Sequence, residues 1–304
     1  HVRSRRQRQM CIRDRDMALR LADEIDADMV VGTDPDSDRL GVAVRDGNGE
    51  MVLLNGNQCG ALLTDYLLSK TDLNGDEFIA YTIVSSELFS QVARSFGVAS
   101  EVCLTGFKHI ASLIRENEGK RTFVGGGEES YGYMVGDFVR DKDALTSTLI
   151  FCDMAAEAKV NGSSAMHRLI ELYRRNGLYK EHLISITKKG KTGAEEISRM
   201  MDTFRQNPPS QFGGEQVIIL DDIKSGIRKN LDTKKESKIN LPSSNVLQFY
   251  TSAGSKISAR PSGTEPKIKF YISLKSDWNE EKTLKDQQKA QEAQIDSIVK
   301  DLTL

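Results

Sequence analysis

The chain has 304 residues, of which 38% are hydrophobic and 28% are charged, and its formal net charge is −2. This is an ordinary soluble composition for two or three domains, and the small net charge argues against a surface for nucleic acid or other polyanions. No apolar run approaches the length needed to span a bilayer, so no membrane partner is expected. The four cysteines are widely spaced, which argues against structural zinc or a disulfide framework and favours the cytoplasm.

Residues 1–15 contain six Arg and lack the apolar core of a signal peptide. We expect a disordered or foreign leader here, with a basic arm for nucleic acid as the alternative. The chain does not begin with Met, and a helix is predicted almost at once, at 17–25. We therefore expect a fragment whose N-terminal part is missing.

In chain order, the apolar pattern predicts three domains after the leader. Residues 16–73 form part of an α/β domain and end at a Gly/Asn/Asp cluster; they contain strands at 29–31 and 40–44 and helices at 17–25 and 57–69. Residues 74–189 form a full α/β domain with parallel strands at 78–84, 101–104 and 122–124 and helices at 86–96, 108–116, 144–159 and 166–176.

The last predicted domain, residues 190–304, is smaller and of the α+β class. Turn formers and polar residues at 190–200 and 205–214 mark its start. Four strands are predicted at 217–220, 246–251, 256–259 and 267–274, followed by a polar helix at 280–302. The predicted fold class is therefore mixed α/β domains followed by a smaller α+β C-terminal domain.

Three carboxylates at alternate positions lie between the first two predicted strands; they are Asp34, Asp36 and Asp38. Anions this close repel one another unless a cation lies between them. Because the available ligands are all oxygens, the pattern predicts a hard divalent ion, Mg²⁺ before zinc or copper. The alternative is a polar turn in which the aspartates hydrogen-bond their own backbone.

The spacing argues against a calcium-binding EF-hand. A loop that starts at Asp34 would need Gly at its sixth position and Glu at its twelfth. Those positions hold Arg39 and Arg45, and the loop is not flanked by helices. A fixed guanidinium beside a metal suits a phosphate ligand, which makes Arg39 a candidate binding residue.

Two segments near the middle of the chain carry further polar groups. In the glycine-rich loop at 125–133, Glu128 and Ser130 alternate and can take paired sugar hydroxyls; the alternative is a flexible loop with incidental acids. At 140–143, Lys142 lies between aspartates. It could exchange a proton if desolvation lowers its pKa, a shift that its acidic neighbours oppose; the alternative is an ion-paired surface cluster.

Two more segments contain candidate phosphate or sugar ligands. The turn at 260–267 offers a guanidinium, two hydroxyls and a free backbone, from Arg260, Ser262, Gly263 and Thr264. A plain turn is the alternative there. Before the helix at 108–116, Thr105 could cap the helix, Gly106 allows a ligand to approach closely, and Lys108 faces a phosphate or solvent.

Taken in this order, the segments resemble the motifs of the α-D-phosphohexomutase family. The matching stretches are Gly32–Arg39, Thr105–Lys108, Gly127–Gly132, Arg140–Asp143 and Arg260–Thr264. The forms Glu-Glu-Ser-Tyr-Gly and Arg-Asp-Lys-Asp are similar to the phosphoglucomutase branch. The resemblance implies a fold of four domains around a central cleft, of which this chain would hold part of the second and all of the third and fourth.

The resemblance also implies a role for each site residue. Asp34, Asp36 and Asp38 would bind Mg²⁺. Two residues would be catalytic: Arg39, near the phosphoserine and the bound sugar, and Lys142, which would transfer a proton. The residues that would read sugar hydroxyls or hold phosphate are Thr105, Gly106, Lys108, Glu128, Ser130, Arg260, Ser262, Gly263 and Thr264.

The implied reaction interconverts glucose 1-phosphate and glucose 6-phosphate through the phosphoserine and a bisphosphorylated sugar, which serves as intermediate and activator. The partner would be a phosphorylated hexose, and the oligomeric state stays open. The family's serine segment is of the type Thr-Ala-Ser-His-Asn-Pro, and no Ser-His-Asn occurs here, so we expect no turnover from this chain alone. The alternatives are a phosphomannomutase, phosphopentomutase or sugar-bisphosphate synthase of the same family, or a non-catalytic sugar-phosphate-binding protein.

Overall fold

The computed structural model describes residues 16–188 and 190–302, and the chain forms two compact units that divide between Asn176 and Gly177. The leader predicted at 1–15 lies outside the described residues. The sequence places domain boundaries at 73/74 and 189/190, whereas the division in the structure comes earlier than the second of these. The reason is strand β8 (Leu178–Thr187), which pairs along its whole length with β15 (Lys267–Ser276) and so belongs to the second unit.

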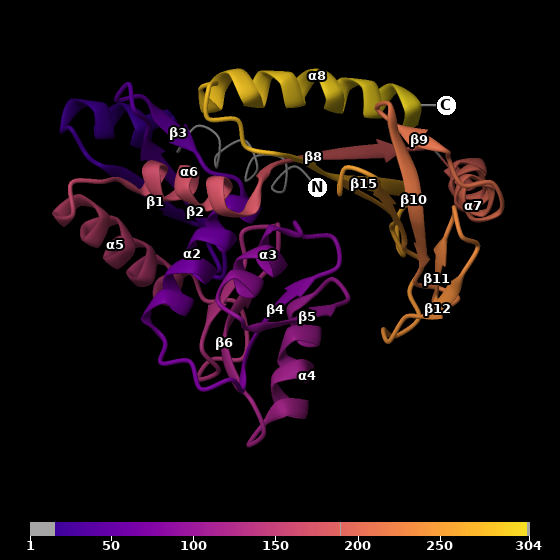
Figure 1. Ribbon diagram of the computed structural model, residues 1–304, viewed down its shortest axis with the longest axis horizontal. Coiled ribbons are helices and arrows are strands. Elements are labelled where there is room, and N and C mark those ends of the chain that lie inside the picture. Colours follow the sequence, from indigo (N-terminus) through magenta and orange to yellow (C-terminus); the bar gives the residue numbers. More distant parts are fainter. Residues whose placement is uncertain (1–15, 189, 303–304) are drawn as a thin grey trace. The chain divides into compact units, whose positions relative to one another are not determined.

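The first unit opens with helical residues 16–24 and an antiparallel three-stranded sheet (Figure 1). Its strands are β1 (Met29–Thr33), β2 (Leu40–Arg45) and β3 (Met51–Leu53), in the order β1-β2-β3. The register pairs Thr33 with Leu40, so the acidic segment forms the tight connection between β1 and β2. The helix and the first two strands were predicted from the apolar pattern; β3 was not.

The first unit also contains a second sheet, with the order β5-β4-β6-β7. Strands β4 (Glu77–Thr82), β5 (Ala99–Cys103) and β6 (Thr122–Gly127) run parallel, as the alternation of strands and helices predicted, and β7 (Tyr133–Val135) is antiparallel to β6. Neighbouring strands are in register at their carboxyl ends, because Thr82 pairs with Cys103 and Tyr81 with Gly127. The loops that follow the three strands therefore emerge at one edge of the sheet.

Helices cover both faces of this sheet. Helix α3 (Leu88–Ser95) places Phe89 in a stack with Tyr81, whereas α4 (Phe107–Asn117) packs in a core with Phe78 and Ala80. Because alternate strand residues face opposite sides of a sheet, α3 and α4 lie on opposite faces. Three further helices complete the unit: α2 (Gly56–Lys70), α5 (Ala144–Val160) and α6 (Ala165–Asn176).

The second unit is built on an eight-stranded antiparallel sheet. Its main path is β12-β11-β10-β13-β14-β15-β8, and β9 pairs with β10. The remaining strand bounds are β9 (Gln211–Phe212), β10 (Glu215–Asp222), β11 (Ile227–Asn230), β12 (Glu236–Lys238), β13 (Leu247–Thr251) and β14 (Lys256–Pro261). Helices α7 (Gly190–Gln206) and α8 (Leu284–Leu302) contribute side chains to the same apolar core as the sheet.

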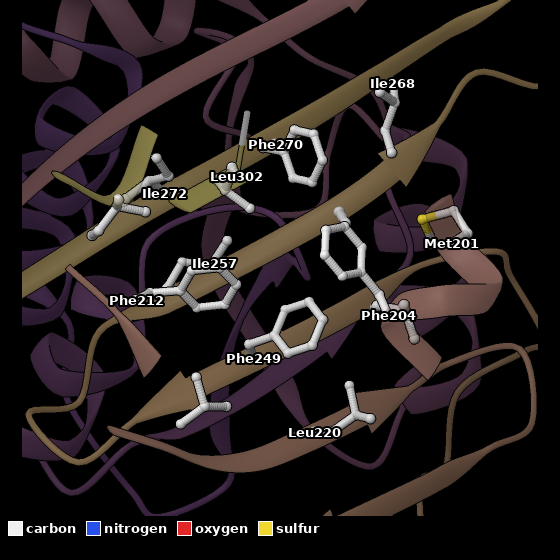
Figure 2. Close-up of a cluster of buried hydrophobic side chains, with 14 of the residues drawn as sticks. Met201, Phe204, Phe212, Leu220, Phe249, Ile257, Ile268, Phe270, Ile272 and Leu302 are labelled. Carbon is white, nitrogen blue, oxygen red and sulfur yellow. The ribbon is translucent and has the colours of Figure 1, made fainter. Parts of the chain in front are cut away.

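Helix α7 corrects a prediction, because the sequence indicated a turn-rich boundary at 190–200. Ile197, Met201 and Phe204 recur at helical spacing and belong to the buried core of the second unit. The Phe204 ring packs edge-on against Phe249 and Phe270 of the sheet (Figure 2). Polar residues between these positions hide the apolar stripe in a simple composition count. Across both described stretches, every helix is too short or too polar to traverse a bilayer.

Candidate active site

The acidic segment forms a turn that Asp34 shapes through its own carboxylate. Asp34 Oδ1 accepts hydrogen bonds from the N–H groups of Asp38 (3.1 Å) and Arg39 (3.2 Å). Ser37 adopts a left-handed backbone with φ of 55°, and Asp36 is exposed at the tip. The polar turn that the sequence left as the alternative is thus present, with one oxygen of Asp34 committed to it.

Asp38 points away from the turn and meets Lys142. Its Oδ2 lies 2.8 Å from Lys142 Nζ, while its Oδ1 is buried, lies 3.6 Å from Arg39 Nε and accepts no hydrogen bond from any residue that the structure describes. Burial alone would raise the pKa of Asp38, but the hydrogen bond from Lys142 and the charges of Lys142 and Arg39 lower it. A buried carboxylate oxygen without a donor fits a cation ligand.

The three aspartates do not converge on one point. Within residues 16–188 and 190–302 there is no group of three or more acidic, His or Cys side chains placed to hold a metal ion. The physical reason is visible in their partners: Asp34 holds the turn, Asp36 faces solvent and Asp38 pairs with Lys142. Asp38 Oδ1 is the atom of the three that best fits a cation.

Lys142 lies in a narrow slot between polar and apolar neighbours. Its side chain is 18% exposed, its Nζ is 5.4 Å from the centre of the Phe107 ring, and a Cβ on Gly132 would overlap its Cδ. Desolvation lowers the pKa of Lys142, but the hydrogen bond to Asp38 and the charges of Asp38, Asp141 and Glu128 more than offset this, so the pKa is raised. The opposition expected from the acidic neighbours is therefore confirmed, the condition of a lowered pKa is not met, and the amine is held as a cation.

Glu128 joins two of the predicted sugar-binding segments. Its side chain is buried, at 7% exposure, and its Oε1 accepts from the Gly106 N–H at 2.7 Å. The Ser130 hydroxyl donates to Glu128 Oε2 at 3.5 Å, and the Glu128 N–H donates to Gly132 O at 2.9 Å, which closes the loop. The predicted pair of Glu128 and Ser130 is thus side by side, next to Gly106.

Thr105 does not cap α4, which corrects the sequence prediction. The N-cap is Gly106, whose φ of 116° favours glycine, and no side chain bonds to the first turn. The hydroxyl of Thr105 is buried and has no hydrogen-bond partner in the described part of the chain, so it remains available to a ligand. Lys108, the second residue of the helix, is exposed.

Backbone hydrogen bonds hold the acidic turn, the loop at 127–132 and the Lys142 segment together. They run from Leu40 N to Tyr131 O (2.9 Å), from Asp143 N to Tyr133 O (2.9 Å) and from Ala144 N to Ser37 O (3.1 Å). Three segments far apart in the sequence therefore form one rigid site within the first unit.

The phosphate-binding candidates lie in the second unit. Arg260 is near the end of β14, pairs in register with Lys269 of β15, and forms no ion pair within the described ranges. The Ser262 hydroxyl accepts from the N–H groups of Thr264 and Glu265, both at 3.3 Å, so it shapes the exposed turn that also contains Gly263. The segment offers a basic strand end followed by a turn with accessible backbone.

Comparisons with known proteins agree with these motifs. Residues 55–173 match the family model for phosphoglucomutase/phosphomannomutase, alpha/beta/alpha domain III. A Staphylococcus epidermidis phosphoglucomutase is 40% identical over 262 residues, which is 86% of this chain. The chain belongs to the α-D-phosphohexomutase family. It spans 48% of the length of that relative, and 47% of a Staphylococcus aureus phosphoglucomutase that is 40% identical over 86% of the chain.

Solved structures of this family have a similar fold. The open form of parafusin, a phosphoglucomutase from Paramecium, aligns with a TM-score of 0.61 at 18% identity, covering 88% of this chain and 45% of its own. A phosphoglucomutase/phosphomannomutase family protein from Burkholderia thailandensis aligns with a TM-score of 0.55 at 17% identity, covering 88% and 46%. At these identities the likeness supports the mixed α/β fold.

Sequence reasoning missed several residues that support the candidate site. Phe107 and Gly132 form the slot for Lys142, and Glu129 contacts the buried hydroxyls of Thr82 and Ser85. The sequence gives a weak indication of Gly132, because this residue ends the Glu-Glu-Ser-Tyr-Gly pattern. The other contacts join distant positions, and no local pattern marks them.

Proposed function

We propose that this chain supplies the metal-, sugar- and phosphate-binding parts of a phosphoglucomutase, which interconverts glucose 1-phosphate and glucose 6-phosphate. The observation that carries the proposal is the cluster of Asp38, Lys142, Glu128 and Ser130, held together by hydrogen bonds between three segments. The name shared by the staphylococcal relatives supports glucose as the sugar. The intermediate of the proposed reaction is a bisphosphorylated sugar, which carries phosphate on both the 1-oxygen and the 6-oxygen.

Each group in the first unit has a chemical task in this proposal. Glu128 accepts from sugar hydroxyls, and Ser130 and the Thr105 hydroxyl donate or accept, so the hexose is oriented in the site. The cationic Lys142, held by Asp38, can donate a proton to the sugar oxygen or offset charge on the phosphoryl group.

Mg²⁺ is part of the proposal. Asp38 would hold it through the buried Oδ1, and Asp34 and Asp36, which do not converge with Asp38 among the described residues, would reorient to join it. The buried Asp38 Oδ1 without a donor, together with an all-oxygen ligand set, supports this choice. When bound, the ion would offset negative charge on the transferred phosphoryl group, as would Arg39 beside it.

In the second unit, Arg260 and the turn at 262–264 hold the phosphate that does not react. Arg260 supplies a forked charged donor, and Lys269 opposite it adds positive charge. Binding energy from this remote phosphate favours orientation of the sugar. A cytoplasmic location completes the proposal, because Cys59, Cys103 and Cys152 are free thiols, as in a reducing compartment.

The test measures binding, because the sequence contains no Ser-His-Asn segment. Calorimetric titration of the chain, with and without Mg²⁺, should show that it binds glucose 1,6-bisphosphate and glucose 6-phosphate. Its affinity for mannose 6-phosphate should be lower. Asp38→Asn and Asp36→Asn should weaken Mg²⁺ binding at least about tenfold, whereas Asp72→Asn, on an exposed loop, should not. A chain that binds neither glucose phosphate would overturn the proposal.

A further inference from the structure

We propose that Glu129 is a positioning residue for sugar recognition. It anchors the loop at 127–132 to the end of β4 and so fixes the direction in which Glu128 and Ser130 face the ligand. This inference rests on the proposed function of that loop as the sugar-binding segment. Its evidence is a set of contacts on the opposite side of the loop from the sugar-binding pair.

The anchor consists of two buried hydroxyls that converge on one carboxylate. Glu129 Oε2 lies 3.1 Å from Ser85 Oγ and 3.4 Å from Thr82 Oγ1, and both hydroxyls can donate to it. The Glu129 N–H in turn donates to Ser85 Oγ at 3.1 Å, so both the side chain and the backbone of this residue are held. Thr82 and Ser85 are 0% exposed, at the carboxyl end of the central strand β4.

The loop itself is short and closed, so one fixed residue orients its neighbours. The Glu128 N–H donates to Gly132 O at 2.9 Å, and Tyr131 between them has a φ of 70°. Side chains alternate along this arch: Glu129 points to Ser85, while Glu128 points to the Gly106 N–H and to Ser130. Rotation of Glu129 away from Ser85 would therefore turn Glu128 away from Gly106.

Electrostatics explain why the anchor is firm. Burial raises the pKa of Glu129, and the charge of Glu128 beside it acts in the same direction. Hydrogen bonds from its own backbone, Ser85 and Thr82 act against both effects. A buried carboxylate is costly unless donors satisfy it, so Glu129 has a strong preference for the one place where hydroxyl donors lie.

The experiment compares Glu129→Ala, Glu129→Gln and Ser85→Ala, with Glu116→Ala on the exposed side of α4 as the control. The first readout is amide hydrogen exchange by NMR at Gly106, whose N–H is held by Glu128, with Ala80 in β4 as the internal reference. Glu129→Ala and Ser85→Ala should speed exchange at Gly106 about tenfold and leave Ala80 unchanged. Glu129→Gln keeps one carbonyl acceptor and should restore most of the protection.

The second readout separates positioning from a structural role. Glu129→Ala should weaken the affinity for glucose 6-phosphate about tenfold, with unchanged Mg²⁺ affinity, and Glu129→Gln should recover it. Wild-type exchange at Gly106 in the Ala variant, or equal acceleration at Gly106 and Ala80, would overturn the anchor. Failure of the unaltered chain to bind glucose 6-phosphate would instead overturn the proposed function, a result that the exchange measurement distinguishes.

Discussion

The ion pair between Lys142 and Asp38 depends on a single close approach. The stem of Lys142 runs past Gly132, and its amine lies over the Phe107 ring and 2.8 Å from Asp38 Oδ2. A Cβ at position 132 would overlap the lysine Cδ and lie 3.2 Å from Phe107 Cε2. Gly132 therefore determines where the cation of the site is held.

We expect Gly132→Ala to displace Lys142 from this slot without unfolding the chain. The overlapping atom belongs to a flexible side chain, which can move, so stability should fall by only about 1 kcal/mol. The measurement is the NMR shift of the Lys142 methylene protons, which the Phe107 ring affects in the wild type. Gly47→Ala is the matched control, because nothing lies within 4 Å of its Cβ. An unchanged Lys142 spectrum in Gly132→Ala would show that the glycine does not set its position.

At the scale of elements, α2 supports the site through a well-formed N-terminus. Asn55 Oδ1 accepts from the Gln58 N–H at 2.8 Å, and Gln58 Oε1 accepts from the Asn55 N–H at 2.9 Å, a reciprocal capping box. The first residue of the helix accepts a hydrogen bond from the Tyr133 hydroxyl at 2.7 Å. The start of α2 is thus joined to β7, directly after the loop at 127–132.

Asn55→Ala should lower the free energy of unfolding by about 1 kcal/mol, because it leaves a helix N–H without its acceptor. Urea denaturation followed by circular dichroism measures this difference. Asn55→Asp retains an acceptor at the same position and should stay close to the wild type. Equal loss in both variants would show that the cap is not the source of the stability.

A second element-scale prediction concerns the turn before β4. The hydrogen bond from the Asn74 N–H to Glu77 Oε1 (2.7 Å) is the main cause of the lowered pKa of Glu77, and the Gly75 N–H adds another at 2.9 Å. A carboxylate whose pKa is lower in the folded chain stabilises the fold at pH values above its unfolded-state pKa, near 4.3. This stabilisation is lost as the pH falls through the folded-state pKa.

The urea midpoint of the wild type should therefore exceed that of Glu77→Gln at pH 7. The difference should shrink as the pH is lowered from about 5 to about 3, because the wild-type carboxylate becomes protonated. Glu116→Gln, at an exposed position of α4 in the same unit, serves as the control. If the difference in urea midpoint stayed constant over this pH range, the charged carboxylate of Glu77 would not be what stabilises the turn.

At the scale of the whole molecule, the binding groups are divided between two compact units. The metal and sugar candidates lie in the unit that ends at Asn176, and Arg260 lies in the unit that begins at Gly177. Each unit has its own core, so a substitution in one should leave the folding of the other unaffected. The two kinds of binding can be separated by mutation.

Arg260→Ala should weaken the affinity for glucose 6-phosphate by about ten- to a hundredfold, since a hydrogen bond to a charged group contributes about 1.5–3 kcal/mol. The affinity for Mg²⁺ should not change, because the aspartates belong to the other unit. Titration calorimetry measures both affinities, with Lys289→Ala, at an exposed position of α8, as the control. A constant sugar-phosphate affinity would exclude Arg260 from the phosphate site.

Much of the first unit was predictable from the chain. The parallel strands β4, β5 and β6 and the turn between β1 and β2 followed from apolar runs separated by polar breaks. Helix α7 and strand β8 were missed, because their few buried residues alternate with polar ones. These residues find their packing and pairing partners only in the sheet of the second unit. Thr105 was wrongly predicted as a cap, since cap geometry depends on the backbone at Gly106.

The sequence by itself determined which chemical groups the protein has and their order along the chain, because residue type and spacing are local properties. Only the tertiary structure decided which atoms meet: Ser85 with Glu129, 44 positions apart, and Lys142 with Asp38. It also decided that the pKa of Lys142 is raised, since that direction depends on whether burial or neighbouring carboxylates dominate. Those contacts depend on packing between distant segments, for which neighbouring residues carry no signal.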